Sequence, residues 1–201
     1  MILKREFYHR DSLTVAKELL GKILIHETPE GITAGKIVET EAYKGPEDKA
    51  SHSYGNRRTP RTETMFGPKG HSYIYLIYGL YYCLNVTSGA ILGKPEATLI
   101  RAIEPIEGMD LMMKRRGPNG QMENIASGPG RLCIAMGLSK LHNGIDVCQT
   151  PFCIEDNPTI SSTDIVETTR IGVDYATDWK DKPWRFYIKS NPFVSVKLRK
   201  Q

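Results

Sequence analysis

Two glutamates in one apolar run are the residues of this chain whose type and spacing most clearly suggest chemistry. Glu39 and Glu41 lie two apart between Ile37 and Tyr43, so on a β-strand they would share one face. A carboxylate buried in such a strand is costly unless it is paired or takes part in a reaction. The sequence therefore leaves two readings open, structural ion pairs or a catalytic carboxylate.

Aromatic side chains adjoin these carboxylates. Tyr43 would project to the same side of the strand as Glu41, and His52 could return from the following loop to face it. A planar base between two such rings gains roughly 1 to 3 kcal/mol per stacking contact. With the basic loop at residues 57–61, this favours chemistry on a nucleic-acid base, although a lone histidine is more often a surface or satisfied residue.

Half of the ten tyrosines fall between Tyr73 and Tyr82. Alternation places Tyr73 and Tyr75 on one strand face, and Tyr78 lies beside Gly79 at an expected hairpin turn. Alternating aromatic residues are ordinary packing material in sheets. A ring at a hairpin tip can instead wedge between stacked bases, and Tyr78 is the best-placed residue for that role.

Composition is that of a soluble globular protein, with 201 residues, 40% hydrophobic and 25% charged. The net charge of +4 is compatible with a polyanionic partner but does not establish one. Charges near the N-terminus and the lack of an apolar run of roughly 20 residues predict no signal peptide or membrane span. The four cysteines show no zinc-ligand spacing, so we expect reduced thiols, no metal and a cytoplasmic protein.

The elements that must position these residues can be read from hydrophobic periodicity and turn residues. The expected helices cover residues 11–20, 105–116 and 127–136, and the expected strands cover residues 22–26, 34–43, 71–78, 80–87, 96–102, 168–173, 185–188 and 194–197, with one more near Phe152. A long loop at residues 44–70 lies between the carboxylate strand and the tyrosine hairpin. This pattern predicts an α+β domain.

Longer motifs make the chain recognisable. It resembles the alkyladenine (3-methyladenine) DNA glycosylase family almost from end to end. The motifs are Gly35-Lys-Ile-Val-Glu-Thr-Glu-Ala-Tyr43, Gly45-Pro-Glu-Asp48, Ala50-Ser-His-Ser53, Thr59-Pro-Arg61, Tyr73-Ile-Tyr-Leu-Ile-Tyr-Gly79, Tyr82-Cys-Leu-Asn85, Leu99-Ile-Arg-Ala-Ile-Glu-Pro105, Ser127-Gly-Pro129 and Arg185-Phe-Tyr187.

The resemblance implies a DNA repair enzyme that flips an alkylated or deaminated purine from duplex DNA and hydrolyses its N-glycosidic bond, leaving an abasic site. Glu41 would be the general base that activates the attacking water, which Arg101 and the backbone carbonyl of Ile171 would help to hold. No cofactor is implied. A carboxylate and a water, with no matched lysine nucleophile, predict a monofunctional hydrolase.

The resemblance also implies how the flipped base is held. Tyr43, His52 and Tyr75 would form its stacking walls, and Tyr78 would fill the gap in the duplex. The base edge would be read by the backbone near Ala50 and His52, while the bulk of Asn85 would discourage the exocyclic amine of undamaged guanine.

The fold implied is a single DNA glycosylase domain over residues 1–201. We expect a mixed, curved antiparallel β-sheet with flanking helices and a protruding DNA-intercalating β-hairpin. The compact form suits a bacterial protein that acts as a monomer on duplex DNA containing damaged purines, away from membranes. Leu80, residues 56–58 and residues 119–124 depart from better-known mammalian members near the expected DNA-facing surface.

Two other functions fit parts of the sequence. A non-catalytic nucleic-acid-binding module would need the basic and aromatic surface but not Glu41. A carbohydrate hydrolase would use Glu39 and Glu41 as its carboxylate pair, but residues two apart on one strand point the same way and cannot flank a glycosidic bond.

Overall fold

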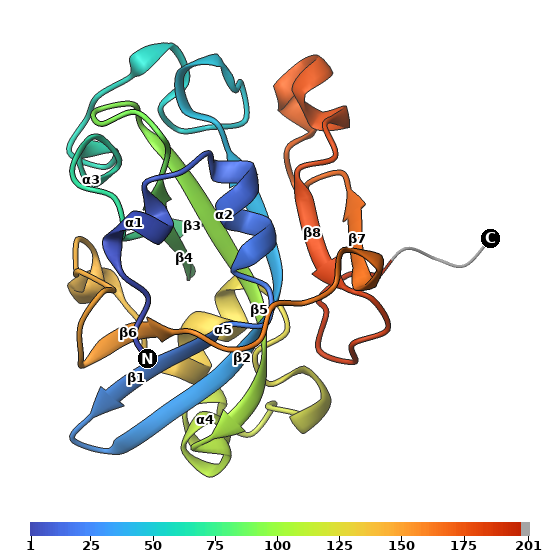
Figure 1. Ribbon diagram of the computed structural model, residues 1–201. Coiled ribbons are helices and arrows are strands. Elements are labelled where there is room, and N and C mark those ends of the chain that lie inside the picture. Colours follow the sequence, from blue (N-terminus) through green and yellow to red (C-terminus); the bar gives the residue numbers. More distant parts are fainter. Residues whose placement is uncertain (198–201) are drawn as a thin grey trace.

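A computed structural model describes residues 1–197, which form a single α+β domain around one curled antiparallel sheet of eight strands, a half-barrel (Figure 1). The strands are β1 (Ile23–Thr28), β2 (Gly31–Tyr43), β3 (Ser72–Ile77), β4 (Tyr81–Ser88), β5 (Glu96–Glu107), β6 (Phe152–Glu155), β7 (Ile165–Thr168) and β8 (Arg185–Ile188). Their order is β3-β4-β5-β2-β1-β6, and β8 joins β2 to β7.

The α-helices are short and connect or cover the strands. They are α1 (Arg5–Tyr8), α2 (Ser12–Glu18), α3 (Glu63–Phe66), α4 (Met109–Arg116) and α5 (Pro129–Met136). Single turns of 3₁₀ helix occur at Gly45–Glu47, Tyr54–Asn56, Met122–Asn124, Lys140–His142 and Ser162–Asp164, and a longer one at Asp174–Asp181. None of the helices in the described chain is long and apolar enough to span a bilayer.

Strand alternation separates the core from a second, polar face of the sheet. Ile74, Leu84 and Ile100 point from β3, β4 and β5 into the main hydrophobic cluster, which also takes in residues of α2 and α5. On β2, Thr40 faces α2, because its hydroxyl donates to the Ala16 carbonyl at 2.7 Å. The odd-numbered positions Glu39, Glu41 and Tyr43 consequently lie on the opposite face, as the strand period predicts.

The carboxylate strand is irregular where it carries the glutamates. The pairing of β2 with β5 shifts register between Ile37 and Glu39 and again between Glu39 and Thr40. Such bulges bend a strand and re-aim its side chains. Over the same stretch β8 pairs with the other edge of β2, Glu41 standing opposite Arg185, so the backbone here is held from both sides.

Most of the predicted elements are confirmed. Helix α2 begins after Asp11, whose carboxylate accepts from the Leu13 amide at 2.9 Å, and the β1–β2 and β3–β4 hairpins lie where expected. The helix predicted over 105–116 is wrong at its start. Residues up to Glu107 remain in β5 because they pair with Ala34 and Gly35 of β2, and only Met109–Arg116 is helical.

Two predicted strands are also wrong. The strand expected at 168–173 is β7, which lies earlier at Ile165–Thr168 and pairs with β8. Residues 169–173 instead turn toward the carboxylates, where Ile171 donates to Glu41. Residues 194–197 form a bend and irregular backbone rather than a strand, and the Ser195 amide there donates to Glu39. In each segment one backbone amide, that of Ile171 or that of Ser195, donates to a buried carboxylate instead of to a neighbouring strand.

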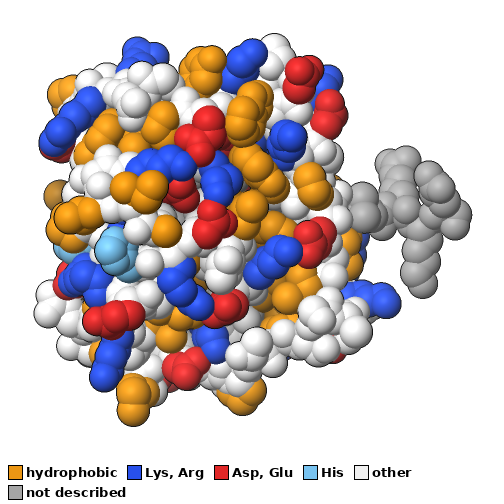
Figure 2. Space-filling model, turned by 45° about the horizontal axis from the view of Figure 1, so that its top comes forward, with side chains coloured by type: hydrophobic (Ala, Val, Ile, Leu, Met, Phe, Trp, Pro, Cys, Tyr) orange, Lys and Arg blue, Asp and Glu red, His pale blue; other side chains and the backbone are white. Residues whose placement is uncertain are grey.

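Charges are mixed over the surface seen in Figure 2. Lys and Arg side chains lie among Asp and Glu side chains on that face. The net charge of +4 is therefore not gathered there into one basic patch.

Candidate active site

A cavity of about 370 Å³ lies on the sheet face opposite the core. Its floor is formed by alternate residues of β3, β4 and β5, and its walls come from the 44–53 loop and residues 171–175. The predicted site residues that line it are Tyr43, Ala50, His52, Tyr75, Tyr78, Asn85, Arg101 and Ile171. The fold thus brings together residues from four separate regions of the sequence.

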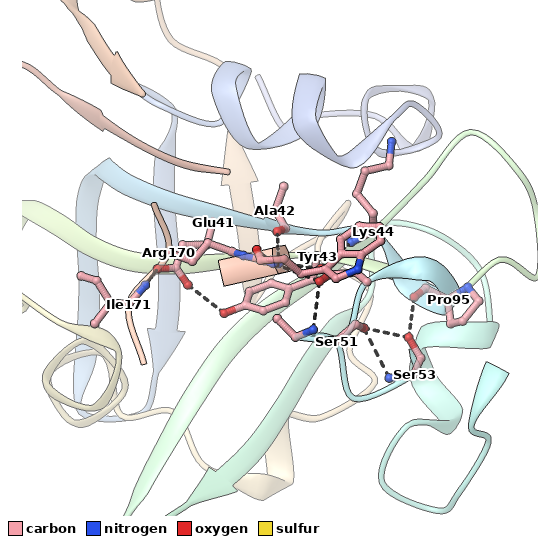
Figure 3. Close-up of polar contacts among 12 residues, drawn as sticks. Glu41, Ala42, Tyr43, Lys44, Ser51, Ser53, Pro95, Arg170 and Ile171 are labelled. Atoms are coloured by element: carbon pink, nitrogen blue, oxygen red, sulfur yellow. Dashed lines mark hydrogen bonds and ion pairs between the residues drawn. The ribbon is translucent and has the colours of Figure 1, made fainter. Parts of the chain in front are cut away.

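Glu41 lies just behind the cavity wall and is completely buried. One carboxylate oxygen accepts from the Ile171 amide at 2.9 Å and lies 3.2 Å from Nη1 of Arg101. The other accepts from the Tyr43 hydroxyl at 2.8 Å, as Figure 3 shows. Burial and the adjacent Glu41 carboxylate raise the pKa of Tyr43, so its phenol stays a neutral donor.

Glu39 is held by a different set of donors. Its Oε1 accepts from Nε of Arg101 at 3.0 Å and from Nε of Arg185 at 2.8 Å, and its Oε2 accepts from the Ser195 amide at 2.7 Å. Burial opposes ionisation, but the two guanidinium groups and the Ser195 amide outweigh it and lower the pKa of Glu39. Two guanidinium groups and one backbone amide are the contacts of a structural carboxylate, whereas neither Glu39 nor Glu41 is itself a lining residue of the cavity.

Arg101 joins the two carboxylates. Its guanidinium meets Glu39 through Nε and Glu41 through Nη1, and it also lines the cavity. Burial alone would lower the pKa of Arg101, yet Glu41 and Glu39 raise it. A permanently charged group therefore lies between Glu39 and the cavity, with Glu41 beside it.

His52 is oriented by two polar neighbours. Its Nδ1 lies 2.8 Å from the Tyr73 hydroxyl, and its Nε2 lies 3.3 Å from Nη2 of Arg61. A guanidinium can only donate, so Nε2 is the acceptor and Nδ1 carries the proton, which it donates to Tyr73. Burial, with a smaller contribution from the Arg61 charge, lowers the pKa of His52 to about 4. The ring is therefore neutral at physiological pH.

Two tyrosines of β3 on the cavity floor lie next to His52. Tyr75 meets His52 edge-to-face with ring centroids 4.5 Å apart, and Tyr73 lies 5.5 Å from Tyr75. The Arg61 guanidinium covers Tyr75 at 4.8 Å from its centroid. The prediction that Tyr73 and Tyr75 share a face is confirmed.

The 44–53 loop is fastened from both ends. Asp48 accepts from the Lys44 and Ala50 amides, and Ser53 donates to the Pro95 carbonyl at 2.8 Å (Figure 3). The Ala50 carbonyl accepts from the Tyr175 hydroxyl at 3.2 Å. The backbone amide and carbonyl of Ala50 thus both have protein partners, and hydrogen bonds hold this part of the cavity wall in place.

Tyr78 and Asn85 occupy opposite ends of the hairpin. Tyr78 is 82% exposed at the tip and has a positive φ of 54°, followed by Gly79 at 69°. These angles, with the Leu80 amide donating to the Ile77 carbonyl, match a type I′ turn, which usually takes Asn-Gly. Asn85 is buried, and its amide donates to the Tyr73 carbonyl at 3.1 Å.

Several residues of the site were not predicted. Arg185 supports Glu39, Arg61 orients His52, Tyr175 forms part of the cavity rim, and Asp48 pairs with Arg170 behind Tyr43. Arg61 and Asp48 stood in recognised motifs but carried no assigned role. Arg170, next to Ile171, gave no signal by spacing, because its partner Asp48 is 122 residues away in the chain.

Comparison with known proteins shows the family to which the chain belongs. Residues 6–192 match the family model described as "Methylpurine-DNA glycosylase (MPG)". Three similar proteins are named "Putative 3-methyladenine DNA glycosylase". The relative from Clostridium acetobutylicum is 52% identical, and the match covers 98% of each chain. The relative from Desulfitobacterium hafniense is 48% identical over 97% of this chain and 98% of the relative. The relative from Alkaliphilus oremlandii is 47% identical over 98% of this chain and 100% of the relative.

The matched region contains the whole cavity, both buried glutamates and the residues that hold Glu41. The chain belongs to the methylpurine-DNA glycosylase family.

Proposed function

We propose that this protein is a monofunctional 3-methyladenine-type DNA glycosylase that flips a damaged purine from duplex DNA and hydrolyses its N-glycosidic bond. Family membership and the relatives' names support the activity. The observation that carries the mechanism is Glu41, a fully buried carboxylate held by three donors against an aromatic cavity.

Glu41 is the general base of this proposal. A carboxylate offers about four lone-pair positions, and Ile171, Arg101 and Tyr43 engage three of them. The fourth, on the oxygen that accepts from Tyr43, is left to take a proton from water. The water then attacks C1′ of the deoxyribose, and the developing positive charge on the sugar is stabilised by the same carboxylate. Arg101 and the carbonyl of Ile171 help to hold that water.

The cavity suits a flipped purine. Tyr43, His52 and Tyr75 supply ring surfaces, and a neutral His52 can stack against a cationic alkylated base without charge repulsion. The backbone at Ala50 and His52 reads the base edge. The Ala50 carbonyl already accepts from Tyr175, so it would accept from the base through its second lone pair. Asn85, locked by its bond to Tyr73, limits the space beside the base and disfavours the exocyclic amine of guanine.

The β3–β4 hairpin is the proposed intercalating element. Tyr78 is exposed at its tip yet lines the cavity, so its ring can fill the duplex at the point from which the nucleotide leaves. Unstacking costs a few kcal/mol, and a damaged or mismatched base is cheapest to extrude. A carbohydrate hydrolase is disfavoured, because Glu39 is bound by two guanidinium groups and the Ser195 amide and lies on the same strand face as Glu41, so the two carboxylates cannot flank a glycosidic bond.

Base release from duplex oligonucleotides carrying one hypoxanthine, and from alkylated DNA, tests the proposal. Wild-type protein should release the base, and Glu41→Gln should abolish release while still binding the lesion duplex. Glu27→Gln, an exposed glutamate on β1, is the matched control and should behave as wild type. Full release by Glu41→Gln would refute the mechanism. Lesion binding without release by the wild type would indicate a non-catalytic module.

A further inference from the structure

The guanidinium of Arg170 is enclosed between two aromatic rings behind the cavity. Its central carbon lies 4.8 Å from the centroid of Tyr43 and 5.1 Å from that of Trp184. Its side chain is fully buried, and its Nε has no hydrogen-bond partner in the described chain. The Arg170 cation thus contacts the rings of both Tyr43 and Trp184.

Hydrogen bonds from its two terminal nitrogens hold the guanidinium against these rings. Asp48 accepts from it at 2.5 and 2.9 Å, the Ala42 carbonyl at 3.0 Å and the Trp179 carbonyl at 3.1 Å. Four contacts from three segments fix the position of the charge, and Figure 3 shows the bond to Ala42 beside Tyr43. The cation cannot move away from the ring without breaking them.

Tyr43 separates this charge from the cavity. Tyr43 lines the cavity, whereas Arg170 and Trp184 do not. A ring has two faces, and Arg170 already lies over one of them. If the proposed function holds, a flipped purine stacks on the other, and Tyr43 then lies between a permanent cation and the base.

We propose that Arg170 is a specificity-determining residue that lowers the preference of the cavity for cationic purines over neutral ones. A cation on one face of an aromatic ring draws electron density toward itself, so a second cation on the opposite face is attracted less. Direct repulsion acts in the same direction across the ring, and Asp48 screens it only in part, because the guanidinium and not the carboxylate lies over the Tyr43 ring. The effect broadens the lesion range toward uncharged bases such as hypoxanthine.

Two substitutions separate charge from packing. Arg170→Gln removes the charge but keeps a planar amide that can stack and donate to Asp48 and Ala42. Arg170→Lys keeps the charge but loses the planar fork. For each folded variant, the rate of base release at limiting enzyme is measured on duplexes with one 7-methylguanine, which is cationic, and with one hypoxanthine, which is neutral.

Arg170→Gln should raise the ratio of the 7-methylguanine rate to the hypoxanthine rate by roughly three- to tenfold, the scale of a partly screened charge about 8 Å away. Arg170→Lys should keep the ratio within about twofold of wild type. An unchanged ratio in Arg170→Gln, with both rates reduced equally, would mean that Arg170 only supports the fold.

Arg170→Gln leaves Asp48 as a buried charge without its ionic partner, which destabilises the fold. If this variant does not fold, the double variant Asp48→Asn/Arg170→Gln serves as the second test. It should shift the ratio in the same direction by a smaller factor, and a shift in the opposite direction would overturn the proposal. Failure of the wild type to release either base would instead refute the proposed function. That outcome differs from an unchanged ratio in the variants, which would refute only the role of Arg170.

Discussion

The Tyr43 hydroxyl donates a 2.8 Å hydrogen bond to the Glu41 carboxylate, so one cavity wall and the buried carboxylate form a single unit. The two residues are neighbours on the same face of β2, and the strand period keeps their side chains together. A ring proposed to stack on the flipped base therefore also orients the group proposed to activate water.

Tyr43→Phe separates these two roles. The ring and its stacking surface remain, but one of the three contacts that orient Glu41 is lost. A hydrogen bond to a charged group contributes about 1.5 to 3 kcal/mol, so the maximal rate of base release should fall at least tenfold with lesion affinity nearly unchanged. Single-turnover kinetics across enzyme concentrations measure both quantities. Weaker binding with an unchanged maximal rate would show that the hydroxyl serves binding instead.

Glu39→Gln should mainly destabilise the fold. It leaves Arg101 and Arg185 in a buried cluster with one carboxylate fewer, and removing one partner of a buried ion pair costs about 3 to 5 kcal/mol. Urea denaturation gives the change in unfolding free energy. Glu104→Gln is the matched control, because both side chains of its pair with Lys36 are about one-third exposed and the pair should contribute under about 1 kcal/mol. Wild-type stability with complete loss of turnover would assign Glu39 to the chemical step.

His52 should make stability depend on pH below neutrality. Its pKa of about 4 in the folded protein lies below the ordinary value of 6.5, so between these values the unfolded chain binds more protons. The stabilisation is complete above pH 6.5 and is lost as pH falls toward 4. His26 and His142 have lowered pKa values and act in the same direction. Urea denaturation of wild type and His52→Gln at several pH values isolates the His52 contribution, and parallel curves would contradict a neutral His52.

Tyr78→Asn should stabilise the protein while impairing lesion capture. Tyrosine is strained at a positive φ, whereas asparagine followed by glycine is favoured in a type I′ turn, so unfolding should cost up to about 1 kcal/mol more. Base release from duplex DNA should slow, with less effect on single-stranded DNA, where no extrusion is needed. Thermal denaturation and release from both substrates test this. Equal slowing on the two substrates would argue against the wedge.

Local patterns were sufficient for most of the fold and for the residues that share a strand. The alternation in residues 37–43 and 73–77 places Glu41 with Tyr43 and Tyr73 with Tyr75, as observed. The failures came where long-range contacts decided the backbone. Residues 169–173 and 194–197 have a composition typical of β-strands. In the structure the Ile171 amide donates to Glu41 and the Ser195 amide donates to Glu39. Arg170 was missed for the same reason, since its partner Asp48 lies far away in the sequence.

The alternation of core and cavity residues along the same strands has a consequence for how this family can diversify. Leu84 and Ile100 anchor the scaffold, while their immediate neighbours Cys83, Asn85 and Leu99 point into the cavity. A substitution at a cavity position changes what the floor presents to a base without altering the packed layer beneath it. The sheet can thus acquire new substrate ranges by point mutation of the cavity floor while the main hydrophobic core stays on the other side of the same strands.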